Sequence, residues 1–263
     1  MPELPEVETI VRTLRPRVVG SRILEARYLS PLAAGHQPEW MAAQLAGRAI
    51  VDLRRAGKFL VFELDQGFLS VHLRMTGKLL FDAVPGPFAR AVLSLDAGTL
   101  VFDDVRQFGR FLWSPALPSN VERLGPEPFE LQPSEFALRL RARRGHVKPL
   151  LLNQQFLGGL GNIYVDEALF RAAIHPLAVA SRVSTRRAQL LHASVVEVLS
   201  EAIAAGGSSI SDYVDAEGRA GSFQRFHRVY GREGEPCLQC GKPIHRIVVG
   251  QRGTHFCPAC QKR

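Results

Sequence analysis

Residues 58–73, KFLVFELDQGFLSVHL, contain two short runs of apolar and β-branched residues separated by a turn sequence. The turn is Asp65-Gln66-Gly67, and a Gly-containing connection of this length predicts an antiparallel hairpin. A second hairpin is predicted around Asp96-Ala97-Gly98, between two further apolar runs. Several short strands at this spacing predict a β-sandwich or a barrel over residues 21–114.

Helical patterns lie on both sides of this β-rich region. Residues 5–17 begin with Pro5 and carry one apolar face, which predicts an amphipathic helix. The composition changes after the Pro- and Gly-containing residues 125–130, and four further helices are predicted there. They span residues 134–144, 148–155, 163–172 and 184–205. The fold class is therefore α+β and multidomain, with an N-terminal helix and β-sandwich followed by a helical region.

The overall composition is that of a globular protein. The chain has 263 residues, of which 46% are hydrophobic and 22% charged, and chains of this length tend to split into two domains. No apolar run approaches the ~18 residues of a membrane-spanning helix. The amino terminus is acidic and shows no basic leader followed by an apolar run, so we expect a cytoplasmic protein.

Basic residues are concentrated at the end of the chain. The formal net charge is +8, of which residues 219–263 contribute +7, with nine Lys and Arg against two Glu. A basic module on a nearly neutral body indicates a polyanionic partner, most often nucleic acid. Charge alone does not distinguish this partner from a basic tail that only aids solubility.

All four cysteines lie in this basic module. They form two CxxC pairs, Cys237-Cys240 and Cys257-Cys260, separated by sixteen residues. Two such pairs predict a tetrathiolate zinc site, whereas a pair of disulfides is disfavoured in a reducing compartment. Four protein ligands leave no open coordination position, so the zinc is expected to be structural. It would hold a small β-hairpin that carries basic residues suited to the DNA backbone.

The first residues of the chain allow two interpretations. Pro2 and Glu3 are ordinary residues to find before a helix. Alternatively, removal of Met1 exposes the secondary amine of Pro2, and an α-amino group, whose pKa is about 8, is partly neutral at physiological pH. The positive end of the following helix further disfavours the protonated amine. A neutral amine here is able to attack a sugar C1′ and form an iminium.

Five motifs together resemble one protein family over the whole chain. They are residues 1–12 (MPELPEVETIVR), 55–58 (RAGK), 72–77 (HLRMTG), 158–164 (GGLGNIY) and 229–237 (VYGREGEPC). In this order they are similar to the bacterial formamidopyrimidine-DNA glycosylases, and the resemblance continues to the last cysteine pair. It implies a catalytic β-sandwich domain at 2–124, a linker at 125–130, a helix–two-turns–helix domain at 131–222 and a four-cysteine β-hairpin zinc finger at 229–263.

The resemblance also implies an activity. A member of this family removes oxidised purines, such as 8-oxoguanine and formamidopyrimidines, from DNA by base excision and then cleaves the abasic strand by β- and δ-elimination. The expected partner is double-stranded DNA that contains oxidised bases or abasic sites. We expect a monomer with one structural Zn²⁺ and no membrane association, working at the bacterial nucleoid during repair.

By the same resemblance, four residues carry the chemistry. Pro2 forms a Schiff base with C1′ of the damaged nucleotide, and Glu3 protonates the sugar oxygen and helps to open the ring. Lys58 contacts a phosphate and transfers a proton during β-elimination. Arg252, on the zinc hairpin, binds the phosphate beside the lesion and assists δ-elimination.

Further residues match the family's DNA contacts. Met75, Arg106 and Phe108 match the set that fills the gap left by an extruded base, which restores part of the lost stacking. Without the resemblance, the two apolar residues would be assigned to the core and the arginine to the surface. Asn162 is expected to contact the DNA backbone. Arg143, in a basic run, fits a phosphate contact and fits a solvated helix end equally well.

Some positions depart from the family, and two alternatives stay open. Gln107 stands where the family often has a second arginine, residues 87–90 lack the frequent histidines, and the base-reading residues of loop 206–221 are unassigned. One alternative is an endonuclease VIII-type glycosylase for oxidised pyrimidines, which Leu4 and the complete gap-filling set disfavour. The other is a catalytically silent zinc-dependent DNA-binding relative, against which the intact Pro2, Glu3 and Lys58 argue.

Overall fold

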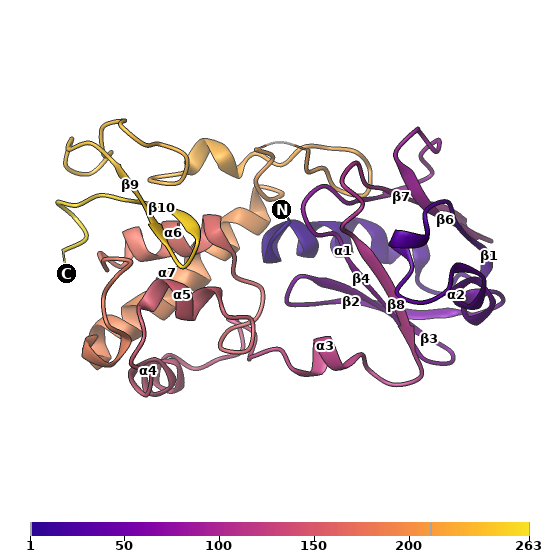
Figure 1. Ribbon diagram of the computed structural model, residues 1–263, viewed down its shortest axis with the longest axis horizontal. Coiled ribbons are helices and arrows are strands. Elements are labelled where there is room, and N and C mark those ends of the chain that lie inside the picture. Colours follow the sequence, from indigo (N-terminus) through magenta and orange to yellow (C-terminus); the bar gives the residue numbers. More distant parts are fainter. Residues whose placement is uncertain (1, 211, 263) are drawn as a thin grey trace. The chain divides into compact units, whose positions relative to one another are not determined.

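The computed structural model describes residues 2–210 and 212–262, which form two compact units. The first unit contains the residues up to 123 together with 203–224, and the second contains 124–202 and 225–263 (Figure 1). Residues 203–224, which we predicted within the 131–222 domain, group with the first unit because Tyr213 and Ala216 pack into its core. The division into functional domains stays a prediction.

The first unit contains a β-sandwich of two four-stranded antiparallel sheets, as the sequence predicts. One sheet has the order β1 (Ile23–Tyr28), β6 (Ala89–Leu95), β7 (Gly98–Asp103) and β5 (Lys78–Phe81). The other has the order β2 (Ile50–Ala56), β3 (Phe59–Leu64), β4 (Phe68–His72) and β8 (Arg110–Ser114). Apolar side chains from both sheets, among them Phe62, Leu93 and Phe102, form one buried core.

Both predicted hairpins are confirmed. At the β3–β4 turn the Leu64 amide donates to the Gly67 carbonyl at 3.0 Å, and Gly67 has a φ of +80°, which glycine adopts without strain. The β6–β7 turn places Leu95 opposite Gly98. These turns fix the register of the strands that lead to His72 and Asp103.

The predicted N-terminal helix is confirmed as α1 (Leu4–Val18), whose apolar face packs into the sandwich core. The prediction of continuous β structure over 21–114 is wrong at α2 (Pro38–Leu45), which lies between β1 and β2. Pro38 starts this short helix, and Met41 and Leu45, one turn apart, are both buried. Two shorter elements complete the region, η1 (Pro31–Ala33) and α3 (Ser119–Glu122).

The second unit is mainly helical. Its helices are α4 (Pro133–Arg141), α5 (Val147–Leu152), α6 (Asn162–Arg171), η2 (Ala180–Arg182) and α7 (Thr185–Ala204), of which the last two residues fall in the first unit; η3 (Phe223–Phe226) follows. The four predicted helices are therefore present, but α4 and α5 each end three residues earlier than predicted. At the end of α5 the reason is local, because the Asn153 side chain accepts a hydrogen bond from the Gln155 amide at 2.9 Å and forms a turn there.

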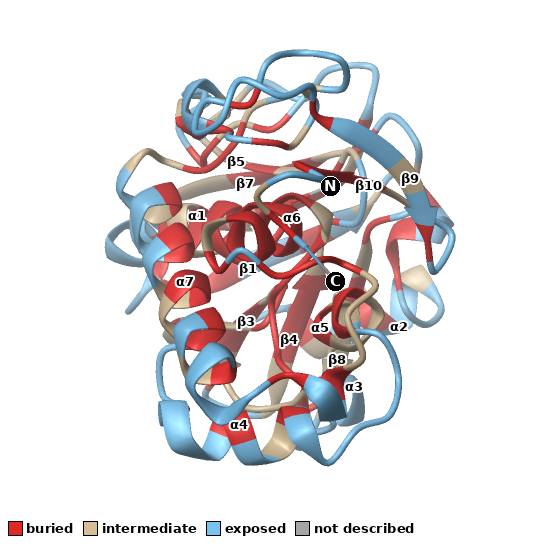
Figure 2. Cartoon of the chain, turned by 90° about the vertical axis from the view of Figure 1, so that its left-hand side faces the viewer, coloured by how far each residue is buried: buried red, intermediate tan, exposed pale blue. Residues whose placement is uncertain are grey.

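The cysteine module contains an antiparallel hairpin of β9 (His245–Val249) and β10 (Arg252–Phe256). Val249 and Arg252 face each other, and Gly250 and Gln251 between them have φ of +56° and +63°, the geometry of a tight two-residue turn. Strand β9 is mostly exposed, whereas β10 is buried from Thr254 onward (Figure 2). Among the described residues, no helix is long and apolar enough to span a membrane.

Candidate functional site

Pro2 and Glu3 lie at the N-terminal end of α1, and both are buried. Glu3 is the N-cap of the helix and forms a capping box with Glu6, in which the Glu3 amide donates to Glu6 Oε2 at 2.8 Å. This reciprocal pairing fixes the backbone of the turn. The positive end of the helix dipole therefore lies beside Pro2. Met1, whose removal we predicted, lies outside the described residues.

Glu6 also joins this turn to loop 206–221. Its Oε1 accepts a hydrogen bond from the Ser208 amide at 2.7 Å, and the Tyr213 hydroxyl donates to the Glu6 carbonyl at 3.2 Å. Gly207 has a φ of +83°, and a Cβ there would lie 2.8 Å from Glu6 Oε1, so only glycine fits. From the sequence, Glu6 was expected only to favour the positive end of the helix dipole, and its link to this loop was not predicted. The loop predicted to contact the damaged base thus packs against the turn that carries Pro2 and Glu3.

Lys58 lies in the tight turn between β2 and β3, where only 6% of it is exposed. The turn is attached to α1 by Arg55, whose Nε donates to Glu8 Oε2 at 2.9 Å. Burial raises the pKa of Glu8, but hydrogen bonds from Arg12 and Arg55 outweigh it and hold this pKa below its usual value. Lys58 is therefore held on the same scaffold as Pro2 and Glu3.

His72 ends β4 directly opposite Phe59 and lies within the electrostatic reach of Lys58. Its Nδ1 accepts a hydrogen bond from the Arg74 amide at 3.0 Å, and its ring packs edge-on against Phe59. Burial, followed by the charges of Arg74 and Lys58, lowers the pKa of His72 to about 3. The ring is thus neutral at physiological pH and acts as a hydrogen-bond acceptor for the loop that follows, which is a structural role.

The three predicted gap-filling residues lie on two loops of the first unit. Met75 and Phe108 are 40% and 46% exposed, although they are large apolar side chains. The Arg106 guanidinium lies over the Phe108 ring, 4.7 Å from its centre. The structure therefore does not place Met75 and Phe108 in the core, where residue type alone would have put them.

The positions that depart from the family have partners of their own. Gln107 has a φ of +56°, and its Oε1 accepts a hydrogen bond from the Ser30 hydroxyl at 2.8 Å. Arg90 donates from Nε to the Asp104 carbonyl at 2.9 Å. Both side chains therefore support the loop that carries Arg106.

In the second unit, Asn162 and the strand of Arg252 are in contact. Asn162 opens α6, and its Nδ2 donates to the carbonyl of Gly253 at 2.9 Å. Arg252 itself is exposed at the start of β10. The structure thus brings Asn162 into contact with Gly253, the residue that follows Arg252, although 91 positions separate the two in the sequence.

A buried ion pair that the sequence analysis missed supports this contact. Lys148 and Asp166 are both fully buried, with Nζ and Oδ1 2.6 Å apart. Lys148 Nζ also donates to the Gly253 carbonyl at 3.2 Å, and Asp166 Oδ2 accepts from the His255 amide at 2.9 Å. The pair therefore anchors the backbone of β10 on both sides of Thr254. The sequence signal for the pair was weak, because a single lysine at the start of a predicted apolar helix is normally solvated.

The second unit contains another buried carboxylate that binds backbone amides. Glu167, also missed, accepts hydrogen bonds from the consecutive amides of Arg228, Val229 and Tyr230 at 2.8–2.9 Å. Burial raises the pKa of Glu167 even though these three amides oppose the shift.

Arg143 lies on an exposed loop after α4, so its predicted DNA contact stays a prediction.

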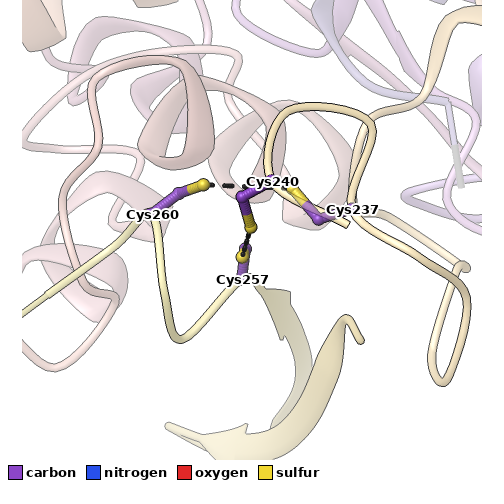
Figure 3. Close-up of side chains that lie close together, drawn as sticks. All are labelled: Cys237, Cys240, Cys257 and Cys260. Carbon is purple, nitrogen blue, oxygen red and sulfur yellow. Dashed lines mark hydrogen bonds between the residues drawn. The ribbon is translucent and has the colours of Figure 1, made fainter. Parts of the chain in front are cut away.

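The four cysteines converge on one point, as the spacing predicts (Figure 3). Their sulfur atoms all lie within 4.8 Å of one another, and all four thiols are free. The Cys237–Cys260 and Cys240–Cys257 sulfur pairs are 3.9 and 3.5 Å apart, close to the edge of about 3.8 Å expected for sulfurs around a tetrahedral zinc. Gly241 turns the chain after the first pair with a φ of +73°. The donor set fits a structural zinc.

Three family models match the chain. The formamidopyrimidine-DNA glycosylase N-terminal domain matches residues 1–111, the H2TH domain of the same enzymes matches 124–214, and a zinc finger found in FPG and IleRS matches 234–263. Among curated proteins, the formamidopyrimidine-DNA glycosylase of Solibacter usitatus is 56% identical over all of both chains. The protein of the same name from Bacillus subtilis is 43% identical, again over all of both chains.

Solved structures give the same result. The MutM (Fpg) protein from Thermus thermophilus has a TM-score of 0.90 at 43% identity and covers 99% of this chain and 98% of its own. A Lactococcus lactis Fpg mutant in complex with DNA containing Fapy-dG has a TM-score of 0.90 at 38% identity, with all of both chains covered. The Lactococcus lactis Fpg complex with abasic-site DNA has a TM-score of 0.89.

Proposed function

The chain belongs to the formamidopyrimidine-DNA glycosylase family, and from this premise we propose how its own residues carry out the reaction. It is a base-excision-repair enzyme that removes oxidised purines from DNA and cleaves the resulting abasic site, with one structural zinc on its four cysteines. The observation that carries the proposed roles is the buried turn of Pro2 and Glu3, which the Glu6 carboxylate attaches to loop 206–221. We place the enzyme in the bacterial cytoplasm, acting at the nucleoid during repair.

Pro2 is the proposed nucleophile. With Met1 removed, the lone pair of its nitrogen forms a bond to C1′ while the bond between C1′ and the damaged base breaks. The base leaves with the electron pair of that bond and takes up one proton, and the Pro2 nitrogen releases one proton. Glu3 donates a proton to the sugar ring oxygen, so that the ring opens and a Schiff base forms between Pro2 and C1′. The adjacent helix end favours the neutral amine that this attack requires.

Lys58 and Arg252 are proposed to act on the phosphates. The Schiff base acidifies the proton at C2′, and its loss expels the phosphate at C3′ in β-elimination. A second elimination then expels the phosphate at C5′. Lys58, as a positioned amine, transfers the proton of the first step. Arg252, with its planar guanidinium, binds the phosphate beside the lesion, and Asn162 binds the same backbone.

Met75, Arg106 and Phe108 are proposed to fill the gap in the helix when the damaged nucleotide is extruded. Extrusion requires a few kcal/mol of lost stacking and pairing. Two exposed apolar side chains and a guanidinium stacked on an aromatic ring are suited to replace that stacking.

Excision from two duplexes tests this proposal. Wild-type enzyme is expected to release 8-oxoguanine opposite cytosine much faster than thymine glycol, and Pro2→Gly is expected to lose normal base excision. Pro16→Ala, in the exposed last turn of the same helix, is the matched control. Preference for thymine glycol would favour an endonuclease VIII-type specificity, and excision by Pro2→Gly at the wild-type rate would rule out Pro2 as the nucleophile.

A further inference from the structure

Two loops of the first unit are joined by one buried carboxylate that the proposed reaction does not use. The Met75 loop comprises residues 73–77, and the Arg106 loop comprises residues 104–109. Asp104 is 0% exposed at the base of the second loop. Its Oδ2 accepts a hydrogen bond from the Gly109 amide at 2.8 Å, so the carboxylate closes its own loop.

The other oxygen of Asp104 reaches the first loop. Thr76 Oγ1 donates to Asp104 Oδ1 at 2.5 Å. The same hydroxyl accepts a hydrogen bond from the Arg106 amide at 3.1 Å, and that amide also lies 3.2 Å from Asp104 Oδ1. The Thr76 hydroxyl therefore connects the Asp104 carboxylate to the backbone of Arg106, a gap-filling residue. Thr76 also directly follows Met75, another gap-filling residue.

Apolar packing reinforces this polar connection. The buried ring of Phe102 lies between the two loops, because a Cβ on Gly77 would lie 2.9 Å from Phe102 Cε2 and a Cβ on Gly109 would lie 2.3 Å from Phe102 Cζ. Neither glycine tolerates a side chain at these distances. The bases of both loops are thus packed on a single ring.

The tips of the loops, in contrast, are exposed and conformationally strained. Arg74 and Gln107 both have a φ of +56°, a conformation that residues with a Cβ rarely adopt. Each is adjacent to a gap-filling residue. Strained backbone persists only where surrounding contacts hold it, and Asp104 and Thr76 supply such contacts at the base of both loops.

We propose that Asp104 is a positioning residue which, through the Thr76 hydroxyl, joins the two loops so that Met75, Arg106 and Phe108 enter the helix as one preorganised group. The proposal rests on the gap-filling role given to these three residues above. Holding the side chains in place before DNA binds reduces the conformational entropy that insertion would otherwise lose. The effect belongs to extrusion of the damaged base and not to the elimination steps.

Variants of Thr76 and Asp104, assayed on two substrates, test the proposal. Thr76→Val removes the hydroxyl and keeps the shape, Thr76→Ser keeps the hydroxyl, and Thr99→Val on β7 is the matched control. Single-turnover rates are measured on an 8-oxoguanine duplex and on a preformed abasic site. Fluorescence of a 2-aminopurine beside the lesion follows unstacking directly. Urea unfolding of each variant confirms that it is folded.

Thr76→Val is expected to lower excision of 8-oxoguanine by roughly 10- to 100-fold more than it lowers abasic-site cleavage, the range that a hydrogen bond to a charged group provides. The 2-aminopurine signal slows in parallel, and Thr76→Ser stays within about threefold of wild type, a small fraction of the loss expected from that bond. Asp104→Asn, which replaces one acceptor oxygen with a donor, behaves like Thr76→Val. Equal losses on both substrates, or a Thr76→Ser as slow as Thr76→Val, would overturn the proposal.

Alanine variants of the three gap-filling residues test separately whether these residues fill the gap at all. If Met75→Ala, Arg106→Ala and Phe108→Ala all excise 8-oxoguanine at the wild-type rate, the gap-filling role itself is wrong. If those variants are slow while Thr76→Val is not, the gap-filling role stands and the positioning role of Asp104 is wrong.

Discussion

The turn that carries Pro2 and the hairpin that carries Arg252 serve one proposed reaction, but they are held in place by different means. The first is built on the sandwich core, and its buried carboxylate, Glu6, is satisfied by two backbone amides. Among the described residues, the buried cluster beside the second is small and comprises Phe170, Val229, Cys237, Ile244 and Cys257. It depends on four thiols and on the buried Lys148–Asp166 pair.

The difference follows from the size of the two regions. A β-sandwich buries enough apolar surface to hold a catalytic turn by packing and capping alone, whereas a module as small as residues 229–263 does not and needs a metal. We therefore expect perturbations of the hairpin to act on DNA binding as a whole, and perturbations of the turn to act on chemistry with smaller changes in stability.

Loss of zinc is expected to give the largest difference between the two regions, because it acts on the folding of the hairpin and not on the sandwich. Cys240→Ser is expected to unfold the hairpin locally and to weaken duplex binding by at least about 100-fold, because binding of a structural zinc provides the folding free energy of such a module. The sandwich is expected to keep its tertiary structure. Fluorescence anisotropy and limited proteolysis measure the two effects, with Gln239→Ser as the exposed control between the same cysteines. Tight duplex binding by Cys240→Ser would contradict the account.

Removal of the buried lysine has the next largest effect. Lys148→Met leaves the Asp166 carboxylate buried without its cation and is expected to reduce the free energy of unfolding by about 3–5 kcal/mol. Urea unfolding of the zinc-loaded protein measures this, and Lys242→Met, exposed in the loop before the hairpin, is the control. A change below about 1 kcal/mol, the range of an exposed ion pair, would show that the pair does not anchor β10.

The corresponding change in the first unit is Glu6→Gln. The amide side chain keeps one acceptor oxygen and faces the other backbone N–H with a donor, so about 1.5–3 kcal/mol of stability is expected to be lost. Excision of 8-oxoguanine is expected to slow as the turn and loop 206–221 separate. Glu39→Gln, in the exposed first turn of α2, is the control. Unchanged stability and an unchanged excision rate would show that the hydrogen bond between Glu6 and Ser208 does not hold the loop against the turn.

Acid sensitivity gives the smallest effect. The folded-state pKa of His72 is lowered to about 3 by burial and by the charges of Arg74 and Lys58. As pH falls below 6.5, the ordinary pKa of histidine, His72 is therefore protonated in the unfolded chain before it is protonated in the folded protein. Stability from this group is complete well above pH 6.5 and declines as pH falls toward 3. Between pH 8 and 5.5 the loss is about 1.4 kcal/mol. His72→Asn, whose Oδ1 replaces Nδ1 as acceptor, should remove that part of the pH dependence; an unchanged slope would contradict the burial of a neutral ring.

Local patterns allowed much of this fold to be predicted. The turn at Gly67, the amphipathic α1 and the cysteine spacing each depend on residues close together in sequence, and each is confirmed. Helix α2 was missed because a helix of only eight residues, about two turns, gives a weak periodic signal. The roles proposed for Pro2, Glu3, Lys58 and Arg252 came from the resemblance and stay predictions.

The supporting residues could not be predicted, because their partners are distant in sequence. Glu6 binds the amide of a residue 202 positions away, and Thr76 binds a carboxylate 28 positions away. In a single sequence Lys148 and Asp166 have the appearance of solvated charges, and only the packing of α5, α6 and β10 shows that they are buried together. The side chains proposed to act were thus recognisable, but the groups that hold them were not.

Borohydride trapping tests the central claim most directly, namely that the turn at Pro2 carries the covalent chemistry. Zinc-loaded enzyme is incubated with a duplex containing one 8-oxoguanine opposite cytosine and is then reduced, and the adduct is mapped by peptide mass spectrometry. We expect a covalent complex at an amino-terminal Pro2. An adduct at a lysine, or no adduct from protein that has lost Met1 and binds the duplex, would contradict it.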